Sequence, residues 1–274
     1  KSPSIGSIGI ETPINKDLGI NIWNKFSAQQ IINNFNYIPD IVSSNHLQKY
    51  LLDVYSSVSI PPKGSSEEII RFVETKLLKI ASAGNSENLE KIVLQLPNSK
   101  RWNRWKKWYV EYNLIKNNDK PACNKVNENL NQNADIFWKK ANIICLLINQ
   151  KMDEANFIND VMFSQKLVDP LFNNLFKRIL NKTDTNNLNF DNSKLEPLHI
   201  IMLDILKYNI SASMIAEFDP EYTLALIDLI YLNNEAKSFL LDKLVSYRDV
   251  NREKIINIYQ SVIETNPDFE LSLK

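Results

Sequence analysis

The sequence of 274 residues contains very little glycine. Its five glycines are all in the first third of the chain, at positions Gly6, Gly9, Gly19, Gly64 and Gly84. Glycine supplies the positive φ angles and the close backbone approach that a phosphate-binding loop or a nucleophile elbow requires. The glycine-free remainder therefore excludes those sites, and it argues against the Asn-Gly and Asp-Gly turns of β-hairpins.

Net charge and long apolar runs are also missing. The 32 Lys and Arg residues are balanced by 32 Asp and Glu residues, so we expect no global attraction to nucleic acid or to an anionic membrane. The longest apolar run covers residues 143–148, far below the roughly 18 residues that a membrane helix needs. We therefore expect a soluble protein with no transmembrane segment. The chain opens on Lys1 without an apolar signal region, which allows for a signal peptide that has been removed.

Histidine is scarce as well. His46 and His199 are the only two, and neither stands at a recognisable motif spacing from a Ser or Cys. Because a Ser or Cys nucleophile usually needs a His base, both are interpreted as structural or surface residues. The carboxylates of Glu68, Asp169 and Asp219 are explained by helix capping. We accordingly expect a protein that is not an enzyme, with no catalytic residues, no cofactor and no metal ion.

What the chain does have is the 3.6-residue periodicity of amphipathic helices. One predicted helix covers residues 44–56, where an apolar stripe is formed by Leu47, Tyr50, Leu51 and Val54. The next helix opens at Ser65, which forms a capping box with Glu68, and it ends at Gly84.

The predicted helices follow one another in a regular rhythm. First members of pairs begin near residues 65, 100, 134 and 169, and second members begin near 86, 119 and 153. This spacing of about 34 residues is the period of tetratricopeptide repeats, although their consensus residues are absent. The predicted fold is all-α: an α-solenoid of antiparallel helix pairs of tetratricopeptide-like type. An irregular helical bundle is the alternative.

Composition divides the chain into four predicted segments. They are an extended N-terminal arm at 1–26, a helical-repeat region at 27–180, an Asn-rich polar loop at 181–194, and a continuation of the helical array at 195–274. Prolines and glycines break the periodicity of the arm. We expect it to lie on the helical body, anchored by Trp23 and Phe26.

Cys123 and Cys145 are the only cysteines. A helical hairpin predicted to turn near residue 132 places them within one helical turn of each other. A disulfide needs Cα atoms about 4.4–6.8 Å apart, and the small side chains of Ala122 and Ala141 beside them permit that approach. One alternative is a disulfide, which stabilises by roughly 3 kcal/mol and indicates an oxidising compartment such as a periplasm. The other is two buried thiols; two thiols without a nearby histidine do not make a metal site.

Residues 100–109 combine five cations with three tryptophans. One helical stripe is formed by Trp102, Trp105, Tyr109 and Tyr112, which predicts that these rings are buried. The opposite face carries Lys100, Arg104, Lys107 and Glu111 and is predicted to be solvated. Trp108 lies off the stripe and is predicted to be exposed. The candidate partner-binding residues are therefore Arg101, Arg104, Lys107 and Trp108, for a protein or peptide partner; single-stranded nucleic acid is the alternative that this spacing disfavours.

Several short motifs resemble an uncharacterised family of alphaproteobacterial envelope proteins. They include Leu18-Gly19, Pro61-Pro62-Lys63-Gly64, Trp138-Lys139-Lys140-Ala141 and Glu196-Pro197-Leu198-His199, together with both cysteines. The resemblance implies a secreted, tetratricopeptide-like helical-repeat protein that keeps its two cysteines and continues beyond residue 274. It implies no activity and no binding residues.

The combined expectation is a non-catalytic periplasmic scaffold or protein-binding module, since stacked helix pairs present concave surfaces that bind peptides and proteins. One alternative is an accessory helical domain of a cell-envelope enzyme or assembly. The other is a cytoplasmic helical repeat that binds nucleic acid.

Overall fold

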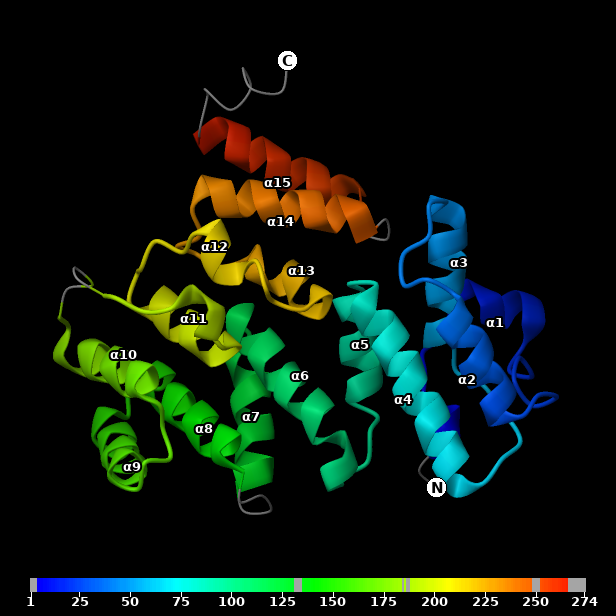
Figure 1. Ribbon diagram of the computed structural model, residues 1–274, viewed down its shortest axis with the longest axis horizontal. Helices are drawn as coiled ribbons and strands as arrows, with labels where there is room; N and C mark the ends of the chain where they lie inside the picture. Colours follow the sequence, from blue (N-terminus) through cyan, green and yellow to red (C-terminus); the bar gives the residue numbers. More distant parts are fainter. Residues whose placement is uncertain (1–3, 131–134, 184, 186–187, 248–251, 266–274) are drawn as a thin grey trace. The chain divides into compact units, whose positions relative to one another are not determined.

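The computed structural model describes residues 4–130, 135–183, 185, 188–247 and 252–265. These residues form helices joined by turns and loops, and no β-strand (Figure 1). The α-helices are α1 (Pro13–Leu18), α2 (Ala28–Tyr37), α3 (Asn45–Ser56), α4 (Ser66–Ser82), α5 (Ser86–Val93), α6 (Asn103–Ile115), α7 (Asp119–Leu130), α8 (Ile136–Ile148), α9 (Met152–Ser164), α10 (Pro170–Asn181), α11 (Pro197–Ile205), α12 (Ala212–Ile215), α13 (Thr223–Leu226), α14 (Asn234–Tyr247) and α15 (Arg252–Thr265). The all-α prediction is confirmed. No helix within the described residues is long and apolar enough to cross a membrane.

The chain forms two compact units. The first consists of residues 1–102, 219–224 and 241–274, and the second of residues 103–218 and 225–240. The boundary thus falls inside the predicted helical-repeat region at 27–180, and two later segments of the chain return to the first unit.

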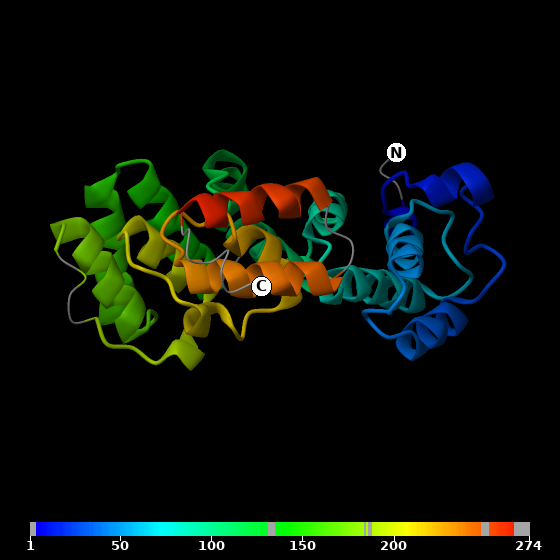
Figure 2. The same ribbon diagram turned by 90° about the horizontal axis from the view of Figure 1, so that it is seen from above.

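In the first unit, α2 and α3 both pack against the long helix α4 (Figure 2). An aromatic cluster fills the space between them: the ring of Phe35 lies 5.5 Å from that of Trp23 and 4.8 Å from that of Tyr55. Phe72 of α4 closes the cluster at 6.0 Å from Trp23. Burying large rings edge to face in this way contributes much of the hydrophobic stabilisation of such a unit.

The N-terminal segment is less extended than expected. It contains α1, which begins at Pro13 after the N-cap Thr12, because proline suits the first turn of a helix. The segment docks through its backbone: the N–H of Ile10 donates to the carbonyl of Ser56 at 2.9 Å. Of the two predicted anchors, Trp23 is buried as expected, whereas Phe26 is half exposed.

The apolar stripe of α3 is not the face that this helix buries. Leu47 and Tyr50 are half exposed, and the buried face carries Gln48, Leu52 and Tyr55 instead. Gln48 is accommodated because its amide accepts from the N–H of Val42 at 2.9 Å and donates to a carbonyl of the same loop. The prediction for Leu47 and Tyr50 is wrong because a polar side chain takes the core position in order to satisfy loop backbone.

In the second unit, α6, α7, α8 and α9 pack side by side in chain order (Figure 1). The helices α6, α8 and α10 begin at residues 103, 136 and 170, and α7 and α9 begin at 119 and 152. The predicted rhythm is therefore kept here. That these pairs are repeats of the tetratricopeptide type stays a prediction.

The turns of the glycine-free region adopt the left-handed conformation all the same. Within the described residues, positive φ angles of 51–60° occur at five non-glycine positions, which are Asn117, Gln150, Lys166, Lys182 and Lys207. Each follows a helix and is part of a closing turn; after α9, for example, the N–H of Leu167 donates to the carbonyl of Met162 at 2.9 Å. Asn, Gln and Lys occupy positions where glycine is the usual choice.

Candidate functional site

Trp108, the predicted exposed contact residue, is buried. Only 2% of its surface is accessible, and its ring stacks on Tyr112 with centroids 4.9 Å apart. The prediction fails because α6 packs against α7, α8 and α11 and so has almost no solvated face. Glu111, which was expected in solvent, is buried for the same reason. The predicted aromatic stripe that contains Tyr112 is buried as expected.

Each of the three cations proposed for partner binding, Arg101, Arg104 and Lys107, has a partner within the chain. Arg101 is held by the carboxylates of Glu74 at 2.6 Å and Glu67 at 2.9 Å. These hydrogen bonds raise the pKa of the guanidinium. Lys107 pairs with Asp135 at 2.6 Å, and the Arg104 guanidinium lies over the ring of Trp105 at 4.8 Å. A role for Arg101, Arg104 and Lys107 in binding a partner stays a prediction, and it requires competition with these contacts.

Cys123 of α7 and Cys145 of α8 are joined by a disulfide, with their Cα atoms 5.7 Å apart. Of the two alternatives, the structure thus has the bridge. Ala122 and Ala141 are both fully buried where the two helices meet, and their small side chains allow the close approach that a bridge requires. Because both cysteines are buried, the bridge is suited to holding α7 against α8 and poorly placed for exchange with outside thiols.

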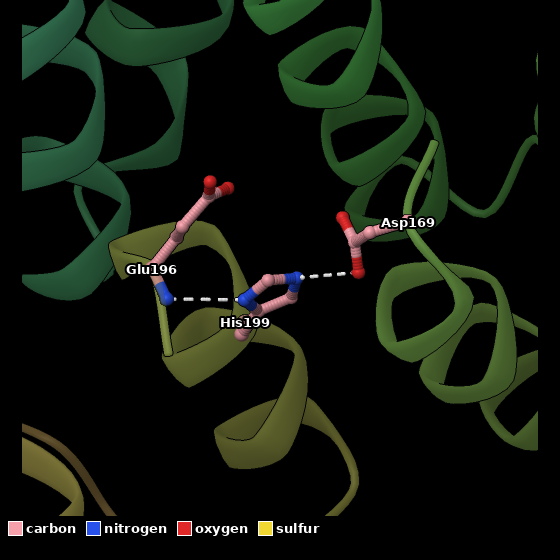
Figure 3. A group of neighbouring side chains, drawn as sticks. All are labelled: Asp169, Glu196 and His199. Carbon is pink, nitrogen blue, oxygen red and sulfur yellow. Dashed lines mark hydrogen bonds and ion pairs between the residues drawn. The ribbon is translucent and has the colours of Figure 1, made fainter. Parts of the chain in front are cut away.

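A polar cluster lies where the second unit brings three helices together. Asp169 caps the start of α10, Glu196 precedes α11, and His199 lies in the first turn of α11 (Figure 3). Asp169 accepts from the N–H of Phe172 at 2.7 Å and contacts His199 Nε2 at 3.2 Å. Lys140 of α8 completes the cluster, since its Nζ lies 2.8 Å from Asp169 and 3.2 Å from Glu196.

The hydrogen bonds of this cluster fix its protonation. His199 Nδ1 accepts the backbone N–H of Glu196 at 3.0 Å, so a neutral ring carries its proton on Nε2 and donates it to Asp169. Burial alone raises the pKa of Asp169, but the bonds from His199 and Lys140 outweigh it and hold that pKa well below its usual range. Burial likewise opposes the charge of Lys140, yet the two carboxylates raise its pKa overall.

The cluster does not fit a metal ion as it is arranged. The ligand atoms that Asp169, Glu196 and His199 offer lie within 4.8 Å of one another, a spacing that suits a bound cation. The Lys140 ammonium already bridges both carboxylates, however, and both nitrogens of His199 are engaged. The geometry also leaves His199 no free lone pair for a general base. The cluster therefore serves to join the starts of α10 and α11 to α8.

The outward side of α9 exposes apolar side chains next to two carboxylates, Asp153 and Asp160, that form no ion pair with a described residue. Phe157 is 71% exposed and Val161 is 39% exposed. Two shallow, open hollows lie along these side chains, of about 530 Å³ and about 250 Å³. We define the α9 face as the residues on this side that line the larger hollow: Asp153, Asn156, Phe157, Asp160, Val161 and Ser164.

Sequence reasoning missed the α9 face, although a signal for it exists. The buried side of α9 carries Ala155, Asn159 and Met162, which already accounts for its packing on α8 and α10. Phe157 and Val161, four residues apart, form a second apolar stripe on the same helix. The neighbouring helices cover one apolar stripe of α9, so the second stripe remains exposed.

No protein-family model, no curated protein and no solved structure matches the chain.

Proposed function

We propose that this chain is a non-catalytic helical scaffold of the periplasm that binds a partner protein through the α9 face. The observation that carries the proposal is the exposed pair Phe157 and Val161 on a helix whose buried residues, Ala155, Asn159 and Met162, lie on a different side. Burying a large apolar side chain contributes roughly 1.5–3 kcal/mol. An aromatic residue beside an apolar hollow is a typical anchor of protein interfaces.

The helical architecture supports a scaffold. Paired helices that begin at regular intervals between α6 and α10 place α9 on a rigid support, which limits the entropy lost when a partner docks. We propose that these pairs belong to an α-solenoid of the kind that presents extended binding surfaces.

The buried disulfide supports an oxidising compartment, because such bridges persist in periplasmic and secreted proteins and are rare in the cytosol. The same location is implied by the resemblance to envelope proteins.

The polar cluster supports a role without chemistry. His199 is the one histidine with carboxylates around it, and both of its ring nitrogens are used in joining helices. The proposal applies equally to an accessory domain that docks an envelope enzyme, since such a domain also needs a binding face and no catalytic residues of its own.

Site-specific photo-crosslinking tests this function. A photoreactive residue at Ser164, on the α9 face, is introduced into the full chain with and without the substitution Phe157→Ala. In native envelope material, a discrete adduct is expected from the first protein and is expected to be lost from the second. Tyr37→Ala is the matched control, because Tyr37 is an even more exposed aromatic, at 87%, in the first unit. An adduct that survives Phe157→Ala, or the absence of any adduct, contradicts the proposal.

A further inference from the structure

The exposed apolar pair Phe157 and Val161 has side chains of opposite charge on its two sides. Among the described residues, Asp153 and Asp160 are the only charged side chains that line the larger hollow. Neither forms an ion pair with a residue that the structure describes. In the smaller hollow, Lys139 of α8 is the only charged side chain from the part of the chain that the structure describes. Phe157 and Val161 line both hollows, so they form an apolar ridge with a negative edge on one side and a positive charge on the other.

The spacing of these residues is helical. Asp153 and Asp160 are seven residues apart, which is two turns and about 10 Å along the axis of α9. Phe157 and Val161 are one turn apart. Phe157 lies between the two carboxylates along the helix, and Val161 follows directly after Asp160. A row of side chains spaced by four residues, with a hollow on each side, is the surface into which a second helix packs its own ridges.

The backbone of α9 excludes the other common way of binding a peptide. Between its end turns, the N–H and C=O groups of α9 are used within the helix. The described part of the second unit has no strand to which an extended peptide could add, and its one β-like contact there is an isolated bridge between Ile210 and Leu232. A partner at this face is therefore recognised by the side chains of α9. A second helix presents its own side chains in matching ridges, so a helical partner is favoured.

Resting on the function proposed above, we infer that the occupant of the α9 face is an amphipathic helix of a partner protein with a basic edge. It carries two Lys or Arg residues seven positions apart, which meet Asp153 and Asp160. Its aliphatic residues between them pack on Phe157 and Val161. Lys139 at the other edge disfavours further cations there and sets the orientation of the helix. The two carboxylates also disfavour nucleic acid and anionic lipid as occupants, because both are negatively charged.

Two designed 18-residue helical peptides test the inference. They share one leucine stripe and differ only at two positions seven residues apart, which are Lys in the first peptide and Glu in the second. Binding of the full, oxidised chain is followed by fluorescence anisotropy at low salt and at 0.5 M salt, conditions we choose because exposed ion pairs are screened by salt. We expect the Lys peptide to bind roughly tenfold more tightly than the Glu peptide at low salt, and the difference to shrink at high salt.

Variants assign the preference to α9. The double substitution Asp153→Asn with Asp160→Asn is expected to reduce the preference for the Lys peptide to about twofold, whereas Asp17→Asn, at an exposed acid of α1, leaves it unchanged. Phe157→Ala is expected to weaken both peptides. Circular dichroism of each variant establishes that it is folded.

The outcomes separate this inference from the proposed function. Equal binding of the two peptides, a preference that survives the double substitution, or no binding of either peptide overturns the basic-helix inference. The scaffold proposal survives those results if the adduct from Ser164 still forms and still depends on Phe157. If that adduct also fails, both are overturned.

Discussion

At the scale of single residues, Lys76 is the most unusual ionisable group of the first unit. It lies in the core, where its Nζ donates to the carbonyls of Ile8 at 3.1 Å and Ser57 at 3.0 Å. No described carboxylate pairs with it. Burial therefore lowers the pKa of Lys76 to about 7. A neutral amine has two N–H groups, enough for both carbonyls.

This lowered pKa predicts a pH dependence of stability. Between pH 8 and pH 9 the folded chain holds Lys76 mostly neutral, while the unfolded chain keeps it protonated up to its ordinary pKa of about 10.4. The unfolded state thus binds more protons, so the free energy of unfolding rises with pH, by roughly 1 kcal/mol per pH unit. Urea unfolding at several pH values measures the slope. Lys76→Met is expected to remove it, and equal slopes in the two proteins would show that Lys76 is charged in the core.

Asp169 predicts a second residue-scale effect. Asp169→Asn is expected to lower the free energy of unfolding by roughly 2–4 kcal/mol, because it leaves the buried Lys140 without its nearer carboxylate. Since the pKa of Asp169 is lowered, its contribution is fully present above the ordinary Asp pKa of about 3.9 and is lost as pH falls from there through the lowered value. Adding Lys140→Met to the first substitution is expected to recover part of the loss. Strictly additive effects in chemical denaturation would contradict this account.

At the scale of helices and turns, the left-handed residues are a local weakness. Lys166 follows α9 with a φ of 56°, a conformation that costs a non-glycine residue about 1 kcal/mol or more. Lys166→Gly is therefore expected to raise the free energy of unfolding by roughly 0.5–1 kcal/mol. Lys177→Gly, at an exposed position inside α10, is the matched control and is expected to lower it by about 1 kcal/mol. A loss of stability in both variants would mean that the turn imposes no strain.

Helix positions were predictable from the sequence where caps mark them. Ser65 and Glu68 form the expected capping box with a 2.7 Å bond from the N–H of Ser65, and Gly84 ends the same helix with a φ of 72°. Caps are local chemistry, which neighbouring residues decide. The buried face of a helix is decided by its partners, so Gln48 of α3 and Trp108 of α6 could not be placed from periodicity alone.

At the scale of the whole molecule, the disulfide is the test of compartment. Replacing Cys123 and Cys145 by alanine is expected to lower the free energy of unfolding by about 3 kcal/mol in the chain-entropy model. Thiol titration of unreduced, denatured wild type is expected to find no reactive thiol. Two reactive thiols would remove both the bridge and its support for a periplasmic location.

The division into two units could not be predicted from the sequence, because it depends on contacts between residues that are far apart in the chain. Periodicity shows that residues 212–247 form helices, and the structure has α12, α13 and α14 there. It does not show that residues 219–224 and 241–247 belong with the first unit and the intervening residues with the second. Long-range assignment depends on contacts between side chains such as Thr223 and Tyr247, whose hydroxyls lie 3.3 Å apart. The α9 face was missed for the same reason, since it is recognised by the packing it lacks.

The central claim is that the α9 face binds a partner protein, and the affinity of the crosslinked partner tests it most directly. Once the partner is purified, its dissociation constant is measured for wild type, Phe157→Ala and Tyr37→Ala, each with its disulfide intact and its unfolding midpoint recorded. The account predicts that Phe157→Ala weakens binding at least tenfold, as expected for an aromatic anchor, while leaving stability nearly unchanged because the side chain is exposed. Tyr37→Ala is predicted to change neither. Equal affinities of wild type and Phe157→Ala would contradict the account.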